Sequence, residues 1–193
     1  MRVVTGVAKG RQLKTPKTTG TRPIIDRVKT ALFDILSDEV EDIRVLDLFA
    51  GTGSVGIEAL SRGAAHATFI EMNYKIVRLV RENLQITGLA AQAEVLHTDA
   101  FKFLQAQARA TTVQPYAMIY IAPPQYEELA ARALNVVDSS PLLDPDGLVV
   151  VQIHPKERPG VAAVECQRLV LSDERRYGST LLMFYRTRKG EQA

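Results

Sequence analysis

Hydrophobic and polar positions along the chain predict strands and helices in regular alternation. Short apolar runs are typical of buried strands, and longer stretches with hydrophobic residues three or four positions apart are typical of amphipathic helices. Repeated units of this kind favour an α/β fold with a mostly parallel sheet and right-handed crossovers. Two further apolar runs near the end predict a closing antiparallel hairpin. The predicted strands span 44–49, 66–71, 93–97, 116–121, 148–153, 167–173 and 181–186, and the predicted helices span 26–36, 55–62, 74–87, 100–110 and 127–137.

The first predicted strand leads into a glycine-rich turn, in the sequence VLDLFAGTGSVGIEAL. Gly51, Gly53 and Gly56 stand between this strand and the next helix. Glycine suits a backbone that needs a positive φ or a close approach to a ligand, and open α/β sheets bind ligands beyond the carboxyl ends of their strands. The glycine spacing alone does not distinguish NAD, FAD and S-adenosylmethionine, but Asp47 inside the strand and Glu71 at the end of the next one favour S-adenosylmethionine. The competing interpretation is a tight turn without a ligand.

Acidic residues lie at or near the ends of three successive predicted strands, and each suits one part of an adenosyl ligand. Asp47 can meet the ligand's ammonium group directly or through water, Glu71 can accept the ribose hydroxyls, and Asp99 can accept the adenine amino group. Asp99 suits a helix N-cap equally well, and the two roles are compatible. Backbone N–H groups of the glycine turn would face the ligand's carboxylate. The predicted donor site comprises Asp47, Phe49, Gly51, Thr52, Gly53, Gly56, Glu71, Met72, Asp99 and Ala100.

The composition is that of a soluble globular enzyme. The 193 residues, 46% hydrophobic and 24% charged, suffice for one domain with a buried core. We expect a small basic β-hairpin or arm at 1–20 and the main domain at 21–193. No apolar run approaches the about 20 residues that span a bilayer, and the N-terminus lacks the core of a signal peptide, so we expect a cytoplasmic protein without a membrane partner. One cysteine and three scattered histidines predict neither a disulfide nor a metal site.

The net charge of +2 conceals an uneven distribution. Residues 1–30 carry eight Lys or Arg and one Asp, which leaves −5 for the rest of the chain. A basic segment on a mildly acidic domain favours a polyanionic partner, because phosphates supply much of nucleic-acid affinity, although a merely soluble flank is the alternative. We expect Arg2, Lys9, Arg11 and Lys14 to contact phosphates, Arg22 and Arg27 to lie nearer the catalytic mouth, and Tyr126 and Tyr177 either to stack on a base or to pack in the ordinary way.

Several segments carry a likeness to a known family. They are TGVAKGRQL at 5–13, RPIIDRVKTALFDIL at 22–36, DLFAGTGSVGIEALSRGA at 47–64, FIE at 69–71, DAF at 99–101, a Pro-Pro turn after the fourth strand, and RRYGST at 175–180. Their order and spacing resemble the RsmD family, bacterial methyltransferases that modify the exocyclic N2 of a guanine in small-subunit ribosomal RNA. The resemblance covers nearly the whole chain. It implies S-adenosylmethionine as donor, a Rossmann-like seven-stranded sheet with a terminal hairpin, and the small ribosomal subunit or its precursor as the partner. The oligomeric state stays open, with a monomer as the default for a chain that binds so large a partner.

One position departs from that family, at the end of the fourth predicted strand. The family carries Asp or Asn, then Pro-Pro, then an aromatic residue, whereas this chain reads YIAPPQY at 120–126. A guanine N2 lone pair is delocalised into the ring, and acceptors on its two N–H bonds direct it toward the methyl group and disperse the developing positive charge. Ala122 offers no side-chain acceptor for this purpose. The resemblance implies that the catalytic residues are Ala122, Pro123, Pro124, Gln125 and Tyr126.

Three functions therefore stay open on the sequence. The first is guanine-N2 methylation in which the backbone carbonyls of Ala122 and Pro123, helped by Gln125, hold the amine. The second is a catalytically weak or inactive assembly factor that binds S-adenosylmethionine and RNA, because one lost transition-state hydrogen bond costs about 10²–10³ in rate. The third is methylation of another amine, in DNA or protein.

Overall fold

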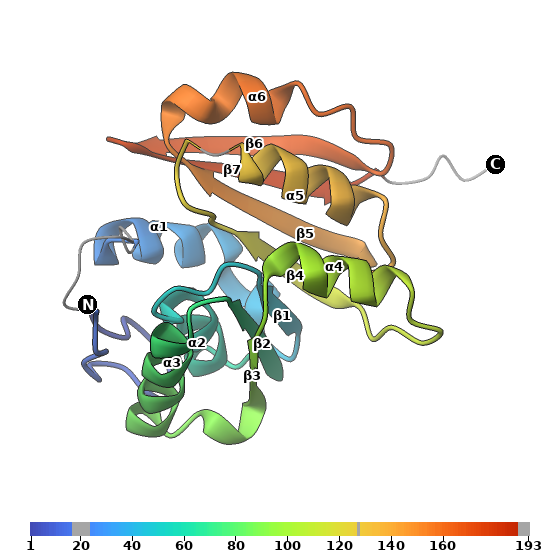
Figure 1. The fold of residues 1–193 in the computed structure, drawn as a ribbon. Coiled ribbons are helices and arrows are strands. Elements are labelled where there is room, and N and C mark those ends of the chain that lie inside the picture. The colour runs from blue at the N-terminus through green and yellow to red at the C-terminus, as the bar shows by residue number, and fades with distance from the viewer. Residues whose placement is uncertain (17–23, 127, 189–193) are drawn as a thin grey trace. The chain divides into compact units, whose positions relative to one another are not determined.

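The computed structural model describes residues 1–16, 24–126 and 128–188, which belong to two compact units, Met1–Ala100 and Phe101–Ala193 (Figure 1). The elements of the first unit are α1 (Asp26–Leu36), η1 (Ser37–Val40), β1 (Arg44–Asp47), α2 (Ser54–Ser61), β2 (His66–Glu71), α3 (Tyr74–Thr87), η2 (Ala90–Gln92) and β3 (Ala93–His97). Strand β2 pairs in parallel with both β1 and β3. Helix α2 packs against β1 and β2, and α3 packs against β2 and β3; the apolar residues of β1 and β2 are buried, whereas those of β3 are only half-buried.

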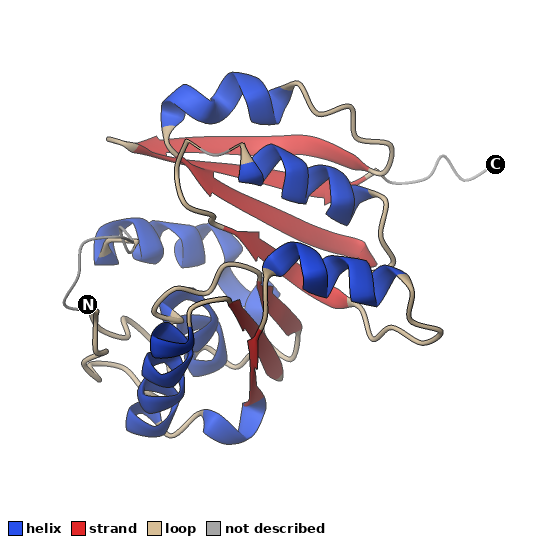
Figure 2. Ribbon diagram, viewed as in Figure 1, coloured by secondary structure: helices blue, strands red, loops and turns tan. Residues whose placement is uncertain are grey.

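The second unit combines parallel and antiparallel pairing. Its elements are α4 (Ala100–Ala108, whose first residue still belongs to the first unit), β4 (Tyr116–Ile121), α5 (Leu129–Asp138), β5 (Leu143–Ile153), η3 (Pro155–Glu157), α6 (Arg158–Ala162), β6 (Leu169–Tyr177) and β7 (Thr180–Thr187). Strands β4 and β5 are parallel, whereas β7 runs antiparallel to both β5 and β6. Helix α5 packs against β4, β5 and α6. Figure 2 distinguishes these helices from the strands.

The predicted fold class is confirmed. The strands follow the order β3-β2-β1 in the first unit and β4-β5-β7-β6 in the second, seven strands in all. Every pair within a unit is parallel except the two pairs that β7 makes. This is an α/β fold with a mostly parallel sheet and a C-terminal antiparallel hairpin. No helix within the described ranges has both the length and the apolar character needed to cross a bilayer.

The structure differs from the sequence-based expectation around β5 and after it. The fifth strand is predicted to begin at 148, but β5 begins at Leu143 and residues 144–147 bulge out of it: Tyr116 pairs with Leu143, and Met118 pairs with Leu148. Between these pairs one residue on β4, Ala117, thus faces four residues on β5, and the Pro and Gly that signal a turn lie in the bulge instead. The short elements η3 and α6 were not predicted, because five helical residues show too little periodicity to detect.

The described part of the basic arm, residues 1–16, folds back on itself and lies against α2. A single antiparallel bridge joins Arg2 and Gln12, beside a hydrogen bond from the Val3 N–H to the Arg11 oxygen at 3.0 Å. Gly6 has a φ of +82°, and a Cβ there would stand 1.6 Å from the backbone oxygen of Ser61. Only glycine fits such a contact, so the arm packs backbone to backbone on the end of α2.

A buried ion pair joins α1 to α2 beneath the arm. The ammonium of Lys29 lies 3.1 Å from Oε2 of Glu58, and both side chains are 0% exposed. Lys29 also donates to the backbone oxygen of Arg2 at 2.7 Å. The charge of Lys29, counted above among the bases of the N-terminal segment, is thus neutralised inside the protein and adds nothing to a binding surface.

The Glu58 carboxylate is fully engaged by the arm and by its own helix. Oε2 accepts the N–H of Val4 at 2.8 Å, and Oε1 accepts the N–H of Thr5 at 2.9 Å. The guanidinium of Arg62, one turn further along α2, donates to Oε1 at 3.1 Å. A buried charge is tolerated when it is paired and hydrogen-bonded in this way. The arm therefore depends on Glu58 for its position.

Replacing Lys29 by Met is expected to destabilise the protein by up to about 3–5 kcal/mol, because the buried Glu58 charge loses its buried partner and keeps only the guanidinium of Arg62. The free energy of unfolding from urea titrations measures this change. The matched control is Lys14→Met, which breaks the 3.1 Å pair with Glu82, where the side chains are 58% and 46% exposed. That variant should lose less than about 1 kcal/mol. Equal, small losses in both variants would contradict the role given to the buried pair.

Candidate methyl-donor and acceptor sites

The glycine turn after β1 owes its glycines to two different constraints. Gly51 and Gly53 have φ values of +52° and +75°, the left-handed region in which other residues are strained. A Cβ on Gly51 would meet nothing within 4 Å, so open space lies in front of this residue. A Cβ on Gly56 would stand 2.4 Å from Cε1 of Phe69. Gly56 is therefore needed so that α2 can pack closely on β2.

Asp47 is a buried carboxylate with one oxygen unpaired. Its Oδ2 accepts the N–H of Gly56 at 3.2 Å. Its Oδ1 is also buried and has no hydrogen-bond partner among the described residues. The pKa of Asp47 is raised from 3.8 to about 7, chiefly by burial; the hydrogen bond from Gly56 opposes this shift, and the nearby charge of Glu71 adds to it. An unpaired buried carboxylate oxygen beside a glycine turn fits a cationic ligand group.

Glu71, at the end of β2, fastens the glycine turn. Its Oε2 accepts the N–H of Gly51 at 3.1 Å, and its Oε1 accepts the N–H of Asn73 at 2.7 Å. The side chain is only half-buried, and each carboxylate oxygen keeps a second lone pair for a ligand hydroxyl. The contacts of Glu71 and Asp47 thus bring together the two predicted acids and two of the predicted glycines.

The other predicted donor residues differ in exposure, although all belong to the first unit. Met72 is 70% exposed, Phe49 and Asp99 are half-buried, and Ala100 is buried. The Thr52 side chain is buried and its hydroxyl lies 3.8 Å from the sulfur of Met1, so it faces the arm.

Three neighbours of this site were not predicted from the sequence. Asn73 caps α3 by accepting the N–H of Lys75 at 3.0 Å. The ring of Tyr74 lies 5.5 Å from that of His97, and Nε2 of His97 lies 3.0 Å from the backbone oxygen of Met72. A polar residue before a helix signals a cap, but a lone histidine at a strand end gives no sequence signal of the partners it will meet.

The predicted catalytic segment follows β4 in the second unit. Ala122 is half-buried and Pro123 is buried, whereas Pro124, Gln125 and Tyr126 are exposed. Pro123 and Pro124 have no N–H to donate, so the backbone presents carbonyl oxygens there. The segment can therefore accept hydrogen bonds from an amine even though Ala122 has no polar side chain.

A carboxylate holds the end of this segment in a strained conformation. Tyr126 has a φ of +67°, which costs an ordinary residue of order 1–3 kcal/mol. Its N–H donates to Oε1 of Glu157 at 3.0 Å, and Oε2 of Glu157 accepts the N–H of His154 at 3.1 Å. The rings of Tyr126 and His154 lie 5.5 Å apart at 45°. Glu157 and His154, which the sequence did not single out, thus fix the backbone and flank the ring of Tyr126.

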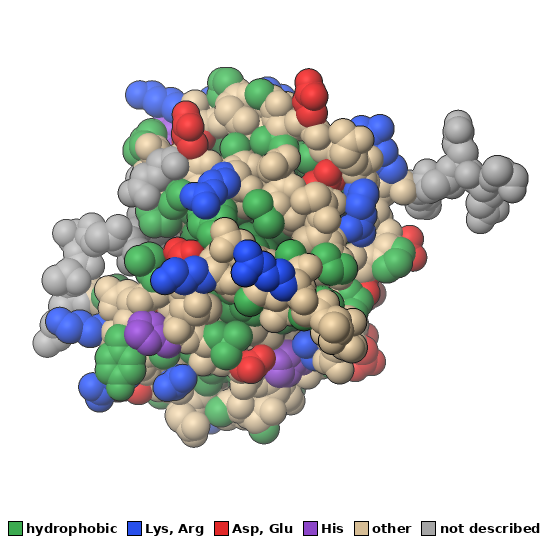
Figure 3. Space-filling model, turned by 45° about the vertical axis from the view of Figure 1, so that its right-hand side comes forward, with side chains coloured by type: hydrophobic (Ala, Val, Ile, Leu, Met, Phe, Trp, Pro, Cys, Tyr) green, Lys and Arg blue, Asp and Glu red, His purple; other side chains and the backbone are tan. Residues whose placement is uncertain are grey.

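The residues predicted to contact RNA lie in both units. Five of those in the first unit are exposed, namely Arg2, Lys9, Arg11, Lys14 and Arg27. Arg22 lies outside the described residues. Figure 3 shows Lys and Arg side chains at the surface interspersed with Asp and Glu. Tyr177 is half-buried and ends β6, where it pairs with Thr180.

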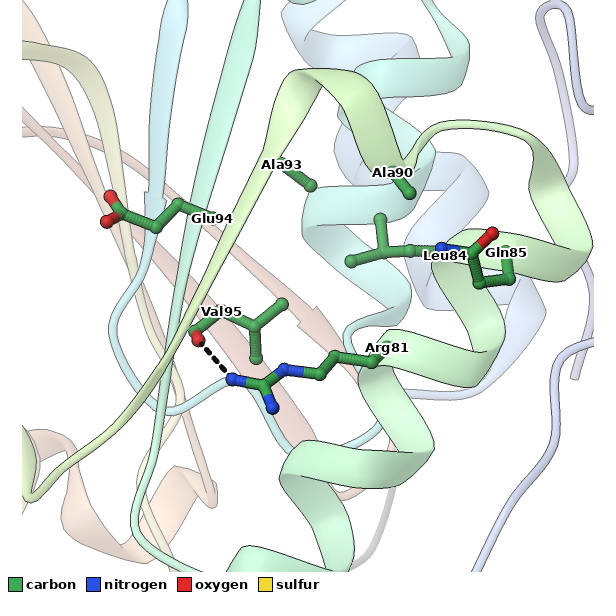
Figure 4. Close-up of a pocket in the computed structure, with 7 residues that line it drawn as sticks. All are labelled: Arg81, Leu84, Gln85, Ala90, Ala93, Glu94 and Val95. Atoms are coloured by element: carbon green, nitrogen blue, oxygen red, sulfur yellow. Dashed lines mark hydrogen bonds between the residues drawn. The ribbon is translucent and has the colours of Figure 1, made fainter.

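A hollow beside α3 is not part of either site. It lies between α3, η2 and β3, and none of its lining residues is a predicted site residue (Figure 4). Arg81 donates to the backbone oxygen of Val95 at 3.1 Å and so covers a carbonyl of β3, the strand at the end of the order. Such cover protects an edge strand from pairing with another chain. No group of three or more His, Cys, Asp or Glu among the described residues could hold a metal ion.

Comparison with known proteins places the chain in a family. The family described as Conserved hypothetical protein 95 matches residues 1–186. The chain belongs to this family, the RsmD family. One family relative is "Ribosomal RNA small subunit methyltransferase D" of Escherichia coli (strain K12), 34% identical over 152 residues, 79% of this chain and 74% of that protein. Another is "Putative rRNA methyltransferase YlbH" of Bacillus subtilis (strain 168), 36% identical over 188 residues, 97% of this chain and 100% of that protein.

Solved structures agree with the family. The structure "Putative methyltransferase yhhF from Escherichia coli" has a TM-score of 0.82 and 31% identity and covers 97% of each chain. An RNA methyltransferase from Salinibacter ruber in complex with S-adenosyl-L-homocysteine has a TM-score of 0.65 at 15% identity, covering 87% of this chain and 95% of that one, which shows a shared fold alone.

Replacing Glu157 by Ala is expected to loosen the segment after β4, because Tyr126 loses the contact that offsets its backbone strain. A hydrogen bond to a charged group contributes about 1.5–3 kcal/mol, and partial exposure reduces this value here. Hydrogen exchange at the Tyr126 amide should become about tenfold faster or more, since about 1.4 kcal/mol corresponds to a factor of ten. Glu165→Ala, at an exposed position in the same unit, is the control. Unchanged exchange in Glu157→Ala would contradict this role.

Proposed function

We propose that the protein transfers a methyl group from S-adenosylmethionine to the exocyclic N2 of a guanine in small-subunit ribosomal RNA. The observation that carries the proposal is membership of the RsmD family together with a donor turn whose buried Asp47 keeps one oxygen unpaired. The cited relatives are described as methyltransferases, so they lend no support to the alternative of an inactive assembly factor.

The residues of the first unit fit the donor's three polar parts. Bound S-adenosylmethionine would supply an electrophilic methyl group on a sulfonium sulfur. Oδ1 of Asp47 can accept from its ammonium group, and Glu71 can accept from its ribose hydroxyls while it holds the N–H of Gly51. No side chain caps the N-terminus of α2, since Gly53 occupies the N-cap position, which leaves that end for the donor's carboxylate.

The segment after β4 serves the acceptor. The backbone oxygens of Ala122 and Pro123 can accept the N–H bonds of the guanine amine, and Tyr126 offers an exposed ring on which a flipped base can stack. Base stacking on an aromatic side chain contributes about 1–3 kcal/mol per base. Methyl transfer mainly requires the donor and the acceptor to be held in line, so positioning supplies much of the rate. The cytoplasm, where ribosomal subunits are assembled, is the proposed location.

The direct test is methyl transfer to unmodified small ribosomal subunits. Purified protein and labelled S-adenosylmethionine are incubated with the subunits, and the RNA is digested to nucleosides. The proposal predicts label in N2-methylguanosine at one site. Label on another nucleoside, or on ribosomal protein, would contradict the proposed substrate.

Donor binding is expected to weaken as the pH falls below about 7, because only the ionised Asp47 attracts an ammonium group. The raised pKa of Asp47 also affects stability. Between pH 3.8 and about 7 the folded protein holds a proton that the unfolded chain releases. The free protein therefore loses stability as the pH rises through this window. Calorimetric titrations with S-adenosylmethionine at pH 5.5 to 8.5 should show an affinity loss of up to about tenfold per pH unit below 7. Asp47→Asn should bind S-adenosylmethionine more weakly, and its affinity should not depend on pH in this way. The same pH dependence of affinity in both proteins would contradict the role given to Asp47.

Replacing Lys9, Arg11 and Lys14 together by Ala is expected to weaken binding to ribosomal RNA. Affinity falls with salt, and each lost phosphate contact should make the slope of log affinity against log salt less steep by about 0.7–0.9. The slope of the triple variant should therefore be less steep by about 2–3. The control exchanges Lys and Arg at the same positions, which keeps the charges and should keep the affinity. Donor affinity should not change in either variant. An unchanged RNA affinity in the Ala variant would rule out the arm as a phosphate-binding surface.

A further inference from the structure

The register of β4 and β5 places a polar side chain next to the position that lacks one. The two strands are parallel, with Tyr120 opposite Val150 and Ile121 opposite Val151. The next residues along the two strands are Ala122 and Gln152. Side chains alternate between the two faces of a sheet along each strand, and neighbours in register share a face. Gln152 therefore stands beside Ala122, on the same face and at the same end of the strands.

A buried tyrosine orients the Gln152 carboxamide. Tyr120 lies two residues before Ala122, so its side chain is on the same face of β4. Its hydroxyl donates to Oε1 of Gln152 at 2.6 Å. Tyr120 is only 3% exposed, whereas Gln152 is half-buried. The Tyr120 hydroxyl is thus fixed inside the protein, and it holds the Oε1 atom of Gln152 at the carboxyl end of β4.

We infer that Gln152, oriented by Tyr120, supplies the side-chain acceptor that Ala122 lacks. This inference rests on the proposed guanine-N2 methylation. An amide oxygen has two lone pairs, of which Tyr120 uses one. The other accepts one N–H of the guanine amine, while a backbone oxygen of the Ala122-Pro123 segment accepts the second N–H. Gln152 is a catalytic residue in this arrangement, and Tyr120 is a positioning residue.

The electron and proton balance of the step is simple. The N2 lone pair forms the new nitrogen–carbon bond, and the carbon–sulfur bond breaks with its electron pair left on sulfur. The methylated nitrogen then carries a positive charge and loses one proton to water, because a carboxamide does not hold a proton near neutral pH. Gln152 thus acts only by accepting a hydrogen bond as charge develops, which is the kind of pre-organised contact that accelerates a reaction most.

Gln152 meets this requirement better than Gln125. Gln125 lies in the exposed turn after β4, where its side chain gains no support from a buried strand. Gln152 belongs to β5, which pairs with β4 on one side and with β7 on the other, where Gln152 faces Leu182. Neighbouring strands lie about 4.8 Å apart, and a glutamine is one methylene longer than an asparagine, which helps it to span that separation.

The test compares single-turnover methyl transfer by the native protein, Gln152→Met and Gln152→Glu on small ribosomal subunits. The Met variant keeps the volume of the side chain without its acceptor, and its rate should fall about 10²-fold while the affinities for donor and RNA stay the same. The Glu variant restores an acceptor oxygen and should react well above the Met variant. Tyr120→Phe should lose less, about tenfold, because the acceptor remains but is no longer held.

Rescue at the neighbouring position is the sharper arm of the experiment. Adding Ala122→Asn to Gln152→Met should raise the rate at least tenfold, because the new carboxamide takes over the same hydrogen bond. This gain cannot come from restored folding alone if donor affinity is already native in the single variant. The control Gln105→Ala changes an exposed residue of α4 and should leave transfer unchanged.

Three results would overturn the inference, and they are distinguishable. If the native protein and Gln152→Met methylate guanine N2 at the same rate, Gln152 has no part in the mechanism, and the proposed function stands. Native protein that transfers no methyl group to guanine N2 would remove the proposed function and the inference with it. If Gln152→Met folds poorly, Tyr120→Phe and Gln152→Glu decide: full native activity in the Phe variant together with none in the Glu variant also overturns the inference.

Discussion

The buried pair between Lys29 and Glu58 organises the first unit, because it joins segments that carry different parts of the proposed reaction. Glu58 belongs to α2, the helix that starts at the glycine turn, and it also accepts the backbone N–H groups of the basic arm. The arm is thus fixed to Glu58 and to Ser61 of α2, the donor turn leads into the start of the same helix, and Thr52 of that turn also faces Met1 of the arm. The RNA-binding surface that we propose for this arm therefore has a defined position relative to the donor turn.

A second buried acid has the opposite character. Glu58 is paired on both oxygens. Asp47 accepts one hydrogen bond, its other oxygen has no partner within the described part of the chain, and its pKa is raised to about 7 chiefly by burial. Leaving a buried acceptor unpaired costs stability. A folded protein that carries such a cost at a glycine turn is prepared for a ligand that removes it. Two acids eleven residues apart thus have different roles: Glu58 stabilises the fold, and Asp47 is available to a ligand.

The sequence predicts most of the elements but little of the side-chain network between them. Helix α3 and strand β2 have the predicted bounds because their periodicity is local and their glycine and polar caps are clear. The sequence does not predict the bulge of β5, since Pro and Gly signal a turn as well as a bulge. The left-handed backbone of Tyr126 depends on Glu157, and the place of Gln152 beside Ala122 depends on strand register. Contacts between distant segments leave no local pattern, so these features emerge only from the fold.

The central claim is that this chain methylates guanine N2 without the Asp or Asn of its family. The most direct measurement is the single-turnover rate of methyl transfer by the native protein and by Ala122→Asp, on the same unmodified small subunits. The account predicts rapid transfer to guanine N2 by the native protein, with a gain of no more than a few-fold in the Asp variant. A silent native protein and an active Asp variant would contradict it, because the site would then have lost its amine acceptor without replacement.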